Sequence, residues 1–192
     1  MKEPIERVTI APCMGIGQTV AGVTRLAAYI VNEELLPDQT ILLCIPALIS
    51  GVIEDIDMAE VYPTIVIDGC SEKCGSHICH FCGIKPAARI YVPEIIHETR
   101  LSPGHTRQEL EESGKELARV VAERVAIIAK GILNDPEYDF KVQKVNMHGF
   151  THDPEIEKTL DYDGYDGFYK PKSMPEINLK EDEKHVAKVL CR

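Results

Sequence analysis

The residues of this chain that can do chemistry are mainly its thiols. The segment 68–83 reads DGCSEKCGSHICHFCG, and it holds four of the seven cysteines and two of the seven histidines of the 192-residue chain. These six residues are Cys70, Cys74, Cys79 and Cys82, with His77 and His80. Thiolates and imidazoles bind zinc, thiolates bind iron–sulfur clusters, and a thiol at a helix N-terminus ionises more easily. The segment therefore indicates a metal site or thiol chemistry.

A strand and a helix are expected to position these thiols. The apolar, β-branched run 64–67 predicts a buried strand that leads into Asp68. Few helix breakers follow before Gly83, which predicts a helix over 71–81 with Cys70 at its N-terminus. We expect Asp68 to cap this helix or to accept hydrogen bonds from backbone N–H groups, rather than to bind a metal ion.

The thiols of the segment form two sets on such a helix. At about 100° per residue, Cys70, Cys74 and His77 lie on one stripe, whereas Cys79 and Cys82 lie mostly on the other side. One ion therefore cannot reach all of them unless the helix breaks. We expect the first stripe to serve the main site. His77, Cys79 and Cys82 either form a second site, support the first one as neighbouring groups, or, for the two thiols, pack in the core.

The chain alternates apolar runs of strand length with amphipathic stretches of helix length. The expected strands are 7–11, 40–43, 64–67 and 88–92, and the expected helices between them are 18–35, 47–58 and 71–81. Continuous apolar strands separated by helices are typical of a parallel sheet covered on both faces. We therefore predict an α/β fold, a three-layer sandwich with a mostly parallel four-stranded sheet, Rossmann-like or flavodoxin-like.

This topology brings distant cysteines together. Cys13, Cys44 and Cys70 each follow a different predicted strand, and Cys74 lies about one helical turn beyond Cys70. Because the carboxyl ends of parallel strands meet at one edge of a sheet, we expect these four thiols to share a metal site there. Four thiolates suit zinc, and they equally suit a [4Fe-4S] cluster.

A long helix and a polar tail follow the predicted sheet. The periodic stretch 106–133 predicts a helix packed on the sheet, with a subunit interface as the alternative. Its apolar stripe consists of Leu110, Leu117, Val121, Val125, Ile128 and Ile132. Beyond it we expect an edge strand at 140–145 and an irregular acidic tail. The predicted domains are an α/β metal-binding domain at 1–135, with its core at 7–93, and a C-terminal extension at 136–192.

Charge and composition exclude several classes of function. A formal net charge of −10 argues against binding to nucleic acid, since no basic patch is present. No run approaches the roughly 18 apolar residues that a membrane-spanning helix needs, so no membrane insertion is expected. The amino-terminal residues do not resemble a secretion signal, which predicts a cytoplasmic protein whose seven cysteines are reduced or bind metal.

The cysteines and their surroundings resemble a known family. Pro12-Cys13, Cys44 before a small apolar helix start, and Asp68-Gly69-Cys70 with Cys74 are similar to the motifs of the DGC-domain family, prokaryotic proteins described as zinc-binding. The resemblance covers about residues 8–92 and implies metal binding by Cys13, Cys44, Cys70 and Cys74. The loop Met14-Gly15-Ile16-Gly17 departs from the family's more polar loop, and His77, Cys79, His80 and Cys82 lie outside its pattern.

Three functions are compatible with these features. The first is a metal-binding protein with an accessory or redox-sensing role in anaerobic-type metabolism. The second is an enzyme that uses an activated Cys70 for sulfur transfer or thiol–disulfide exchange. The third is an interaction module, in which the 106–133 helix and the C-terminal tail bind a protein partner or a second copy and the metal is structural.

Overall fold

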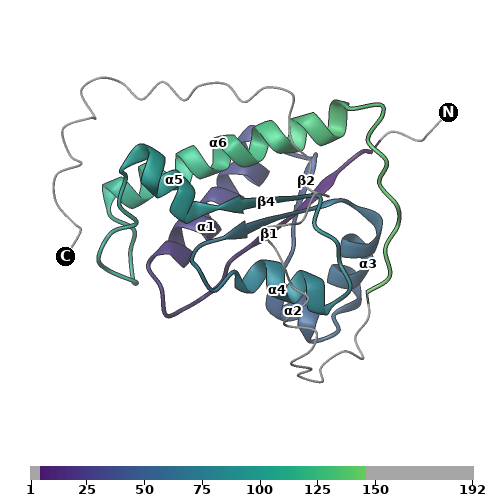
Figure 1. The fold of residues 1–192 in the computed structure, drawn as a ribbon, viewed down its shortest axis with the longest axis horizontal. Coiled ribbons are helices and arrows are strands. Elements are labelled where there is room, and N and C mark those ends of the chain that lie inside the picture. Colours follow the sequence, from purple (N-terminus) through teal and green to yellow (C-terminus); the bar gives the residue numbers. More distant parts are fainter. Residues whose placement is uncertain (1–4, 146–192) are drawn as a thin grey trace.

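A computed structural model gives the structure of the chain, and it describes residues 5–145. Strands and helices alternate along this part (Figure 1). The strands are β1 (Val8–Pro12), β2 (Thr40–Leu42), β3 (Thr64–Asp68) and β4 (Ala88–Tyr91). The helices are α1 (Val20–Tyr29), α2 (Ile45–Ile49), α3 (Ile53–Val61), α4 (Cys74–Phe81), α5 (Val92–Thr99) and α6 (Glu112–Asn134), and the π-helical segment η1 (Ile30–Leu35) continues α1.

The four strands form one parallel sheet in the order β2-β1-β3-β4. Its register pairs Ile10 with Leu42 of β2 on one side and with Ile65 of β3 on the other. Every residue of β1 and β3 is buried, as the continuous apolar runs predict for central parallel strands. The predicted α/β fold with a four-stranded parallel sheet is therefore confirmed.

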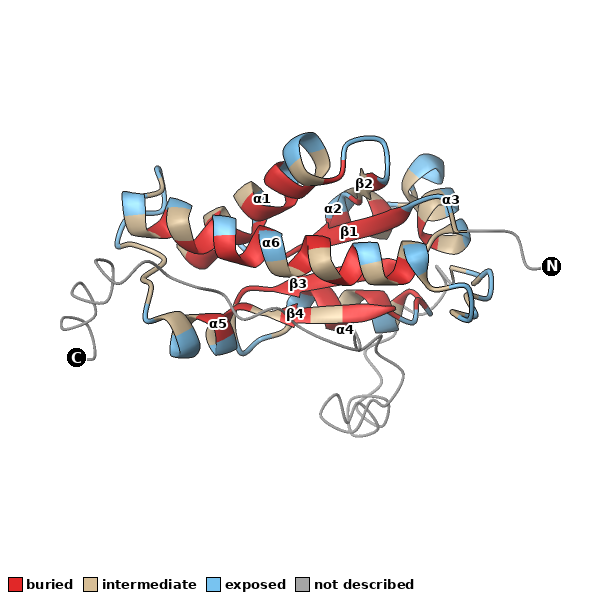
Figure 2. Cartoon of the chain, turned by 90° about the horizontal axis from the view of Figure 1, so that it is seen from above, coloured by how far each residue is buried: buried red, intermediate tan, exposed pale blue. Residues whose placement is uncertain are grey.

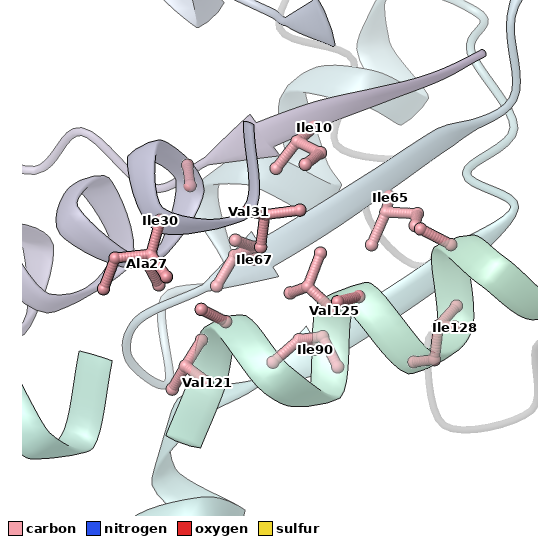
Figure 3. Packing of buried hydrophobic residues seen from close by; sticks show 14 of the residues in the cluster. Ile10, Ala27, Ile30, Val31, Ile65, Ile67, Ile90, Val121, Val125 and Ile128 are labelled. Atoms are coloured by element: carbon pink, nitrogen blue, oxygen red, sulfur yellow. The ribbon is translucent and has the colours of Figure 1, made fainter. Parts of the chain in front are cut away.

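Helices α1, α5 and α6 cover one face of the sheet. Ile65 and Ile67 of β3 point toward α6 and meet Val121, Val125 and other apolar residues of that helix in the larger core (Figure 3). The buried face of α6 runs along the sheet from end to end (Figure 2). The predicted apolar stripe thus packs on the sheet, and α6 also lies along α1.

Helices α2, α3 and α4 cover the opposite face, where a smaller core lies (Figure 1). Because side chains alternate along a strand, Val66 of β3 points to this side while its neighbours point to the other. Ala11, Leu43 and Leu48 join it there, together with Cys79 and Cys82. The chain is therefore a three-layer α/β/α sandwich.

Three of the predicted helices have different bounds in the structure. The expected helix 47–58 is divided into α2 and α3 because the chain turns at Gly51, whose φ of +83° cannot continue a right-handed helix. The expected helix 71–81 begins only at Cys74, and the expected helix 106–133 begins only at Glu112. Before α4, the left-handed backbone of Lys73 at φ of +46° prevents an earlier helix start.

The expected strand 88–92 is β4, which is one residue shorter, but the helix that follows it was not predicted. Pro93 lies in the first turn of this helix, α5, where the missing N–H of proline is tolerated. One expected strand was wrong. Residues 140–145 form no strand. The Gln143 amide donates a hydrogen bond of 3.0 Å to the Glu60 carbonyl, and the Val145 amide donates one of 2.8 Å to the Glu60 carboxylate, so this segment follows α3.

The ends of the chain are only partly described. Of the predicted C-terminal extension 136–192, the structure describes residues 136–145. The acidic tail and Cys191 lie outside the described residues. Within residues 5–145, no helix combines the length and the apolar character that crossing a membrane requires.

Candidate metal centre

Cys13 follows β1 directly, at the carboxyl edge of the sheet. Its amide donates a hydrogen bond of 2.8 Å to the carbonyl of Ile67 in β3. Its carbonyl accepts a hydrogen bond of 2.6 Å from the hydroxyl of Thr24 in α1. The residue is 5% exposed. The chain runs from β1 to β2 on one side and then to β3 on the other side of β1, so the strand order changes direction at β1. Cys13, at the end of β1, therefore lies at the usual ligand-binding position of such sheets.

A tight turn carries the chain from β3 to α4. The Lys73 amide donates a hydrogen bond of 3.1 Å to the Cys70 carbonyl, and Lys73 itself has a left-handed backbone with φ of +46°. Helix α4 then begins at Cys74. Cys70 therefore lies before the helix, not at its N-terminus as the sequence suggests. Cys74 occupies the first helical position, next to the positive end of the helix dipole.

Two glycines allow the surrounding elements to approach this turn closely. A Cβ atom on Gly69 would lie 3.1 Å from Cγ1 of Val20 in α1. A Cβ atom on Gly75 would lie 2.8 Å from Cγ1 of Val66 and 3.1 Å from Oδ1 of Asp68. Both contacts are shorter than packed carbon atoms normally make. The absence of a side chain at these positions thus lets α1 and α4 pack against the end of β3.

The carboxylate of Asp68 caps α4. Its Oδ1 accepts hydrogen bonds of 3.0 Å from the Gly75 amide and 3.2 Å from the Ser76 amide, and its Oδ2 accepts one from the Ser76 hydroxyl. Asp68 and Ser76 are fully buried. This confirms the expected capping role of Asp68. Its oxygens are engaged in holding α4 on β3, and the thiols remain as the ligand candidates at this edge.

The surroundings of the Cys74 thiol indicate which side chains lie close together at this edge of the sheet. Partial burial raises the pKa of its thiol above the ordinary cysteine value, and negative charge on Cys13, Cys70, Asp68 and Glu72 raises it further. The strand register agrees with this, because Pro12 pairs with Ile67 at the ends of the adjacent strands β1 and β3, and Cys13 and Cys70 follow shortly after these two residues. The structure thus brings together three thiols that the sequence separates, one after β1, one after β3 and one at the start of α4.

Cys44 lies at the same edge, after β2, but its surroundings differ. It is exposed, and its amide donates a hydrogen bond of 2.8 Å to Oδ1 of Asp55 in α3. Its carbonyl accepts a hydrogen bond of 2.9 Å from the Leu48 amide in α2. Cys44 is not among the groups that raise the pKa of Cys74. Its place as a fourth ligand stays a prediction.

The other ligand candidates of α4 lie on two different sides of that helix. Cys79 and Cys82 are buried at 0% and 2% exposure in the smaller core, whereas His77 and His80 are exposed. Burial raises the pKa of both thiols, and for Cys79 the neighbouring Cys82 and Asp68 add to this effect. Partial burial and the charge of His77 lower the pKa of His80. The two thiols therefore pack as small apolar groups.

Sequence reasoning missed a group of cations beside the thiols. The Lys73 ammonium lies 5.5 Å from the centre of the Tyr91 ring, and the Arg89 guanidinium lies 5.8 Å from the same centre. Tyr91 is paired in register with Asp68 across β3 and β4. These contacts fix the left-handed turn against the edge strand. No local sequence pattern could have found this group, because it depends on the register between β3 and β4.

As the side chains stand in residues 5–145, no three of His, Cys, Asp or Glu are arranged so that they could hold a metal ion. The three neighbouring thiols Cys13, Cys70 and Cys74 nevertheless have the donor chemistry that zinc and iron–sulfur clusters take. The fold and this edge define an α/β protein with a group of thiols at the switch point of a parallel sheet.

The chain belongs to the DGC domain family, whose model matches residues 9–124. The match begins in β1 and ends within α6, so it includes the sheet apart from Val8 and the six cysteines of the described residues. No match to the chain was found among curated proteins or among solved structures.

Proposed function

We propose that this protein binds a metal at the carboxyl edge of its sheet through Cys13, Cys70 and Cys74, with Cys44 as the fourth ligand. Zinc is the first candidate and a [4Fe-4S] cluster is the alternative. Membership of the DGC domain family supports a metal-binding role in general. The choice of ligands depends on the site itself.

The observation that carries the proposal is the convergence of the thiols: Cys13 and Cys70 follow adjacent paired strands, and Cys74 opens the next helix. Negative charge on Cys13 and Cys70 raises the pKa of Cys74, so a thiolate at Cys74 is disfavoured by negative charge on either of them. A bound cation removes that repulsion and stabilises the deprotonated forms. Neutral thiols packed for stability alone would not need to converge from three elements on the ligand-binding edge. In this proposal the side chains reorient when the metal binds.

Two features bear on the choice between zinc and a cluster, and they point in opposite directions. Thiolates on separate loops, rather than on one compact knuckle, suit a cluster or an exchangeable ion somewhat better than a structural zinc. A [4Fe-4S] cluster takes four thiolates, whereas a zinc ion can be held by three, and the charges that act on Cys74 include Cys13 and Cys70 but not Cys44, which favours a single ion. Zinc with three thiolates and an open position would activate a bound thiol or water.

Within this proposal, an accessory or redox-sensing role in anaerobic-type metabolism is compatible with the exposure of the thiols. Cys44 and Cys74 are exposed, and Cys70 is partly exposed. Exposed metal-bound thiolates are open to oxidants, and their oxidation releases the metal. The protein would in this way respond to oxygen or to thiol-oxidising compounds.

The thiol enzyme is the weaker alternative. A nucleophilic cysteine requires a lowered pKa, and burial with neighbouring negative charge raises that of Cys74. Cys70 lies before α4 and outside its first turn. The interaction module would use the 106–133 helix, whose apolar stripe is buried on the sheet, and the C-terminal tail, of which residues 146–192 lie outside the described part of the chain.

The metal-to-protein ratio and the absorption spectrum of anaerobically purified protein test the proposal. We expect about one zinc ion per chain without visible absorption, or iron and sulfide with the broad visible absorption of a cluster. C13S, C70S and C74S should each lose metal, and C191S, outside the family match, should retain it. A colourless wild-type protein without stoichiometric metal would overturn the proposal.

A further inference from the structure

The outward face of α4 carries a second set of possible ligands. Cys74, His77 and His80 follow one another at intervals of three residues, and all three are exposed. The opposite side of the helix, with Gly75 and Cys79, is buried against the sheet. The helix therefore directs its two histidines to the solvent and its remaining thiol to the core.

The two imidazoles are neighbours. Residues three apart on a helix lie on adjacent turns, with their Cβ atoms about 5–6 Å apart. His77 acts electrostatically on His80, in agreement with that spacing. Two imidazoles on consecutive turns can bind one ion as a chelate, and the neutral ring is the common protein ligand for divalent zinc, nickel and copper.

We propose that His77 and His80 form a binding site for a divalent first-row transition-metal ion, distinct from the thiol edge. Two imidazoles would bind the ion, and water would complete its coordination. The site uses neither Cys79 nor Cys82, which are buried in the core. It lies one helical turn from Cys74, so the ion is held beside the thiol edge without sharing a ligand with it.

Other exposed histidines of the described part provide matched controls. His97 in α5 and His105 in the loop before α6 are exposed as well, and neither has another histidine or a cysteine within four residues. They are single imidazoles on the same protein. If His77 and His80 chelate one ion, they should bind it more tightly than His97 or His105 does. If the ion only binds single imidazoles on the surface, all four histidines should bind it with similar affinity.

The test is a titration of the full-length protein with Ni²⁺ at neutral pH, followed by NMR of the imidazole protons and by calorimetry. Paramagnetic Ni²⁺ below one equivalent should broaden the signals of His77 and His80 before those of His97 and His105. H77N and H80N should each weaken the binding at least about tenfold, because the second imidazole acts as an intramolecular ligand. H97N and H105N should leave it unchanged.

A variant without the edge thiols separates this site from the proposed metal centre. In C13S/C70S/C74S, the Ni²⁺ site at the histidines should persist, and adding H77N and H80N should remove it. Wild-type protein that holds no metal at its thiols would end the metal-centre proposal and leave this one intact. Equal broadening of all exposed histidines, or unchanged affinity in H77N, would overturn the histidine site.

Discussion

The carboxylate of Asp68 accepts a hydrogen bond of 3.0 Å from the amide of Gly75, and this contact joins the end of β3 to the first turn of α4. The same residue precedes Gly69-Cys70, and Gly75 follows Cys74 directly. The two thiols are thus placed between the partners of one buried interaction. Their relative position therefore depends on that interaction.

D68N should therefore lower both stability and metal content. The amide keeps the shape of the side chain but loses the charge that the Gly75 and Ser76 amides stabilise. We expect a loss of about 1–3 kcal/mol in the free energy of unfolding, measured by urea denaturation. E72Q removes a nearby exposed carboxylate and should change stability by less than about 0.5 kcal/mol. Equal effects of both substitutions would contradict the capping role of Asp68.

G75A should destabilise the protein even though alanine favours helices by about 1 kcal/mol over glycine. The added methyl group would lie 2.8 Å from Cγ1 of Val66, so α4 must move away from the sheet. A net loss of about 1–3 kcal/mol is expected from thermal or urea unfolding. In G17A the new Cβ has no atom within 4 Å, and stability should stay within about 0.5 kcal/mol of wild type.

The pH dependence of Cys74 alkylation in metal-free protein should show the effect of the neighbouring thiol of Cys70. Because negative charge on Cys70 contributes to the raised pKa of Cys74, C70S should lower that pKa. The rate of alkylation, followed by mass spectrometry of the Cys74 peptide, should then reach its half-maximal value at a lower pH than in the otherwise wild-type protein. C191S serves as the control and should not shift the profile. An identical profile in C70S would show that the two thiols do not interact.

Alkaline pH should destabilise the fold through the buried thiol of Cys79. Its pKa is raised in the folded protein, so above about pH 8.5 the unfolded chain loses this proton while the folded chain keeps it. Stability is therefore complete below that pH and falls as the pH rises, by about 1.4 kcal/mol per pH unit for this group. Urea unfolding at several pH values should show the fall, and C79A should reduce its slope. A slope unchanged by C79A would contradict this assignment.

The sheet was predictable because its signal is local. β1 and β3 are continuous apolar runs, and a parallel sheet follows from runs of that kind separated by helices. The topology predicted from the sequence also places Cys13 and Cys70 at one edge of the sheet, and this prediction needs no information about side-chain contacts. The stripe of α6 was equally readable, since a period near 3.6 residues persists from Leu117 to Ile132.

The errors arose where backbone conformation, not side-chain periodicity, sets the structure. The positive φ of Gly51 ends α2 inside an apolar period, and the left-handed Lys73 delays α4 by one turn. Pro93 is compatible with the end of a strand and with the start of a helix, and the sequence does not distinguish them. The group formed by Lys73, Arg89 and Tyr91 depends on register between strands, which no local pattern contains.

The pairing of β1 with β3 also has a consequence for the order of events during synthesis. Cys13 leaves the ribosome long before Cys70 and Cys74, and the carbonyl of Ile67 that binds its amide is made just as late. A nascent chain that ends after β2 carries Cys13 and Cys44 without their companions. The complete group of thiols therefore exists only in a chain whose amino-terminal half has finished folding, and an ion retained there would mark that chain as mature.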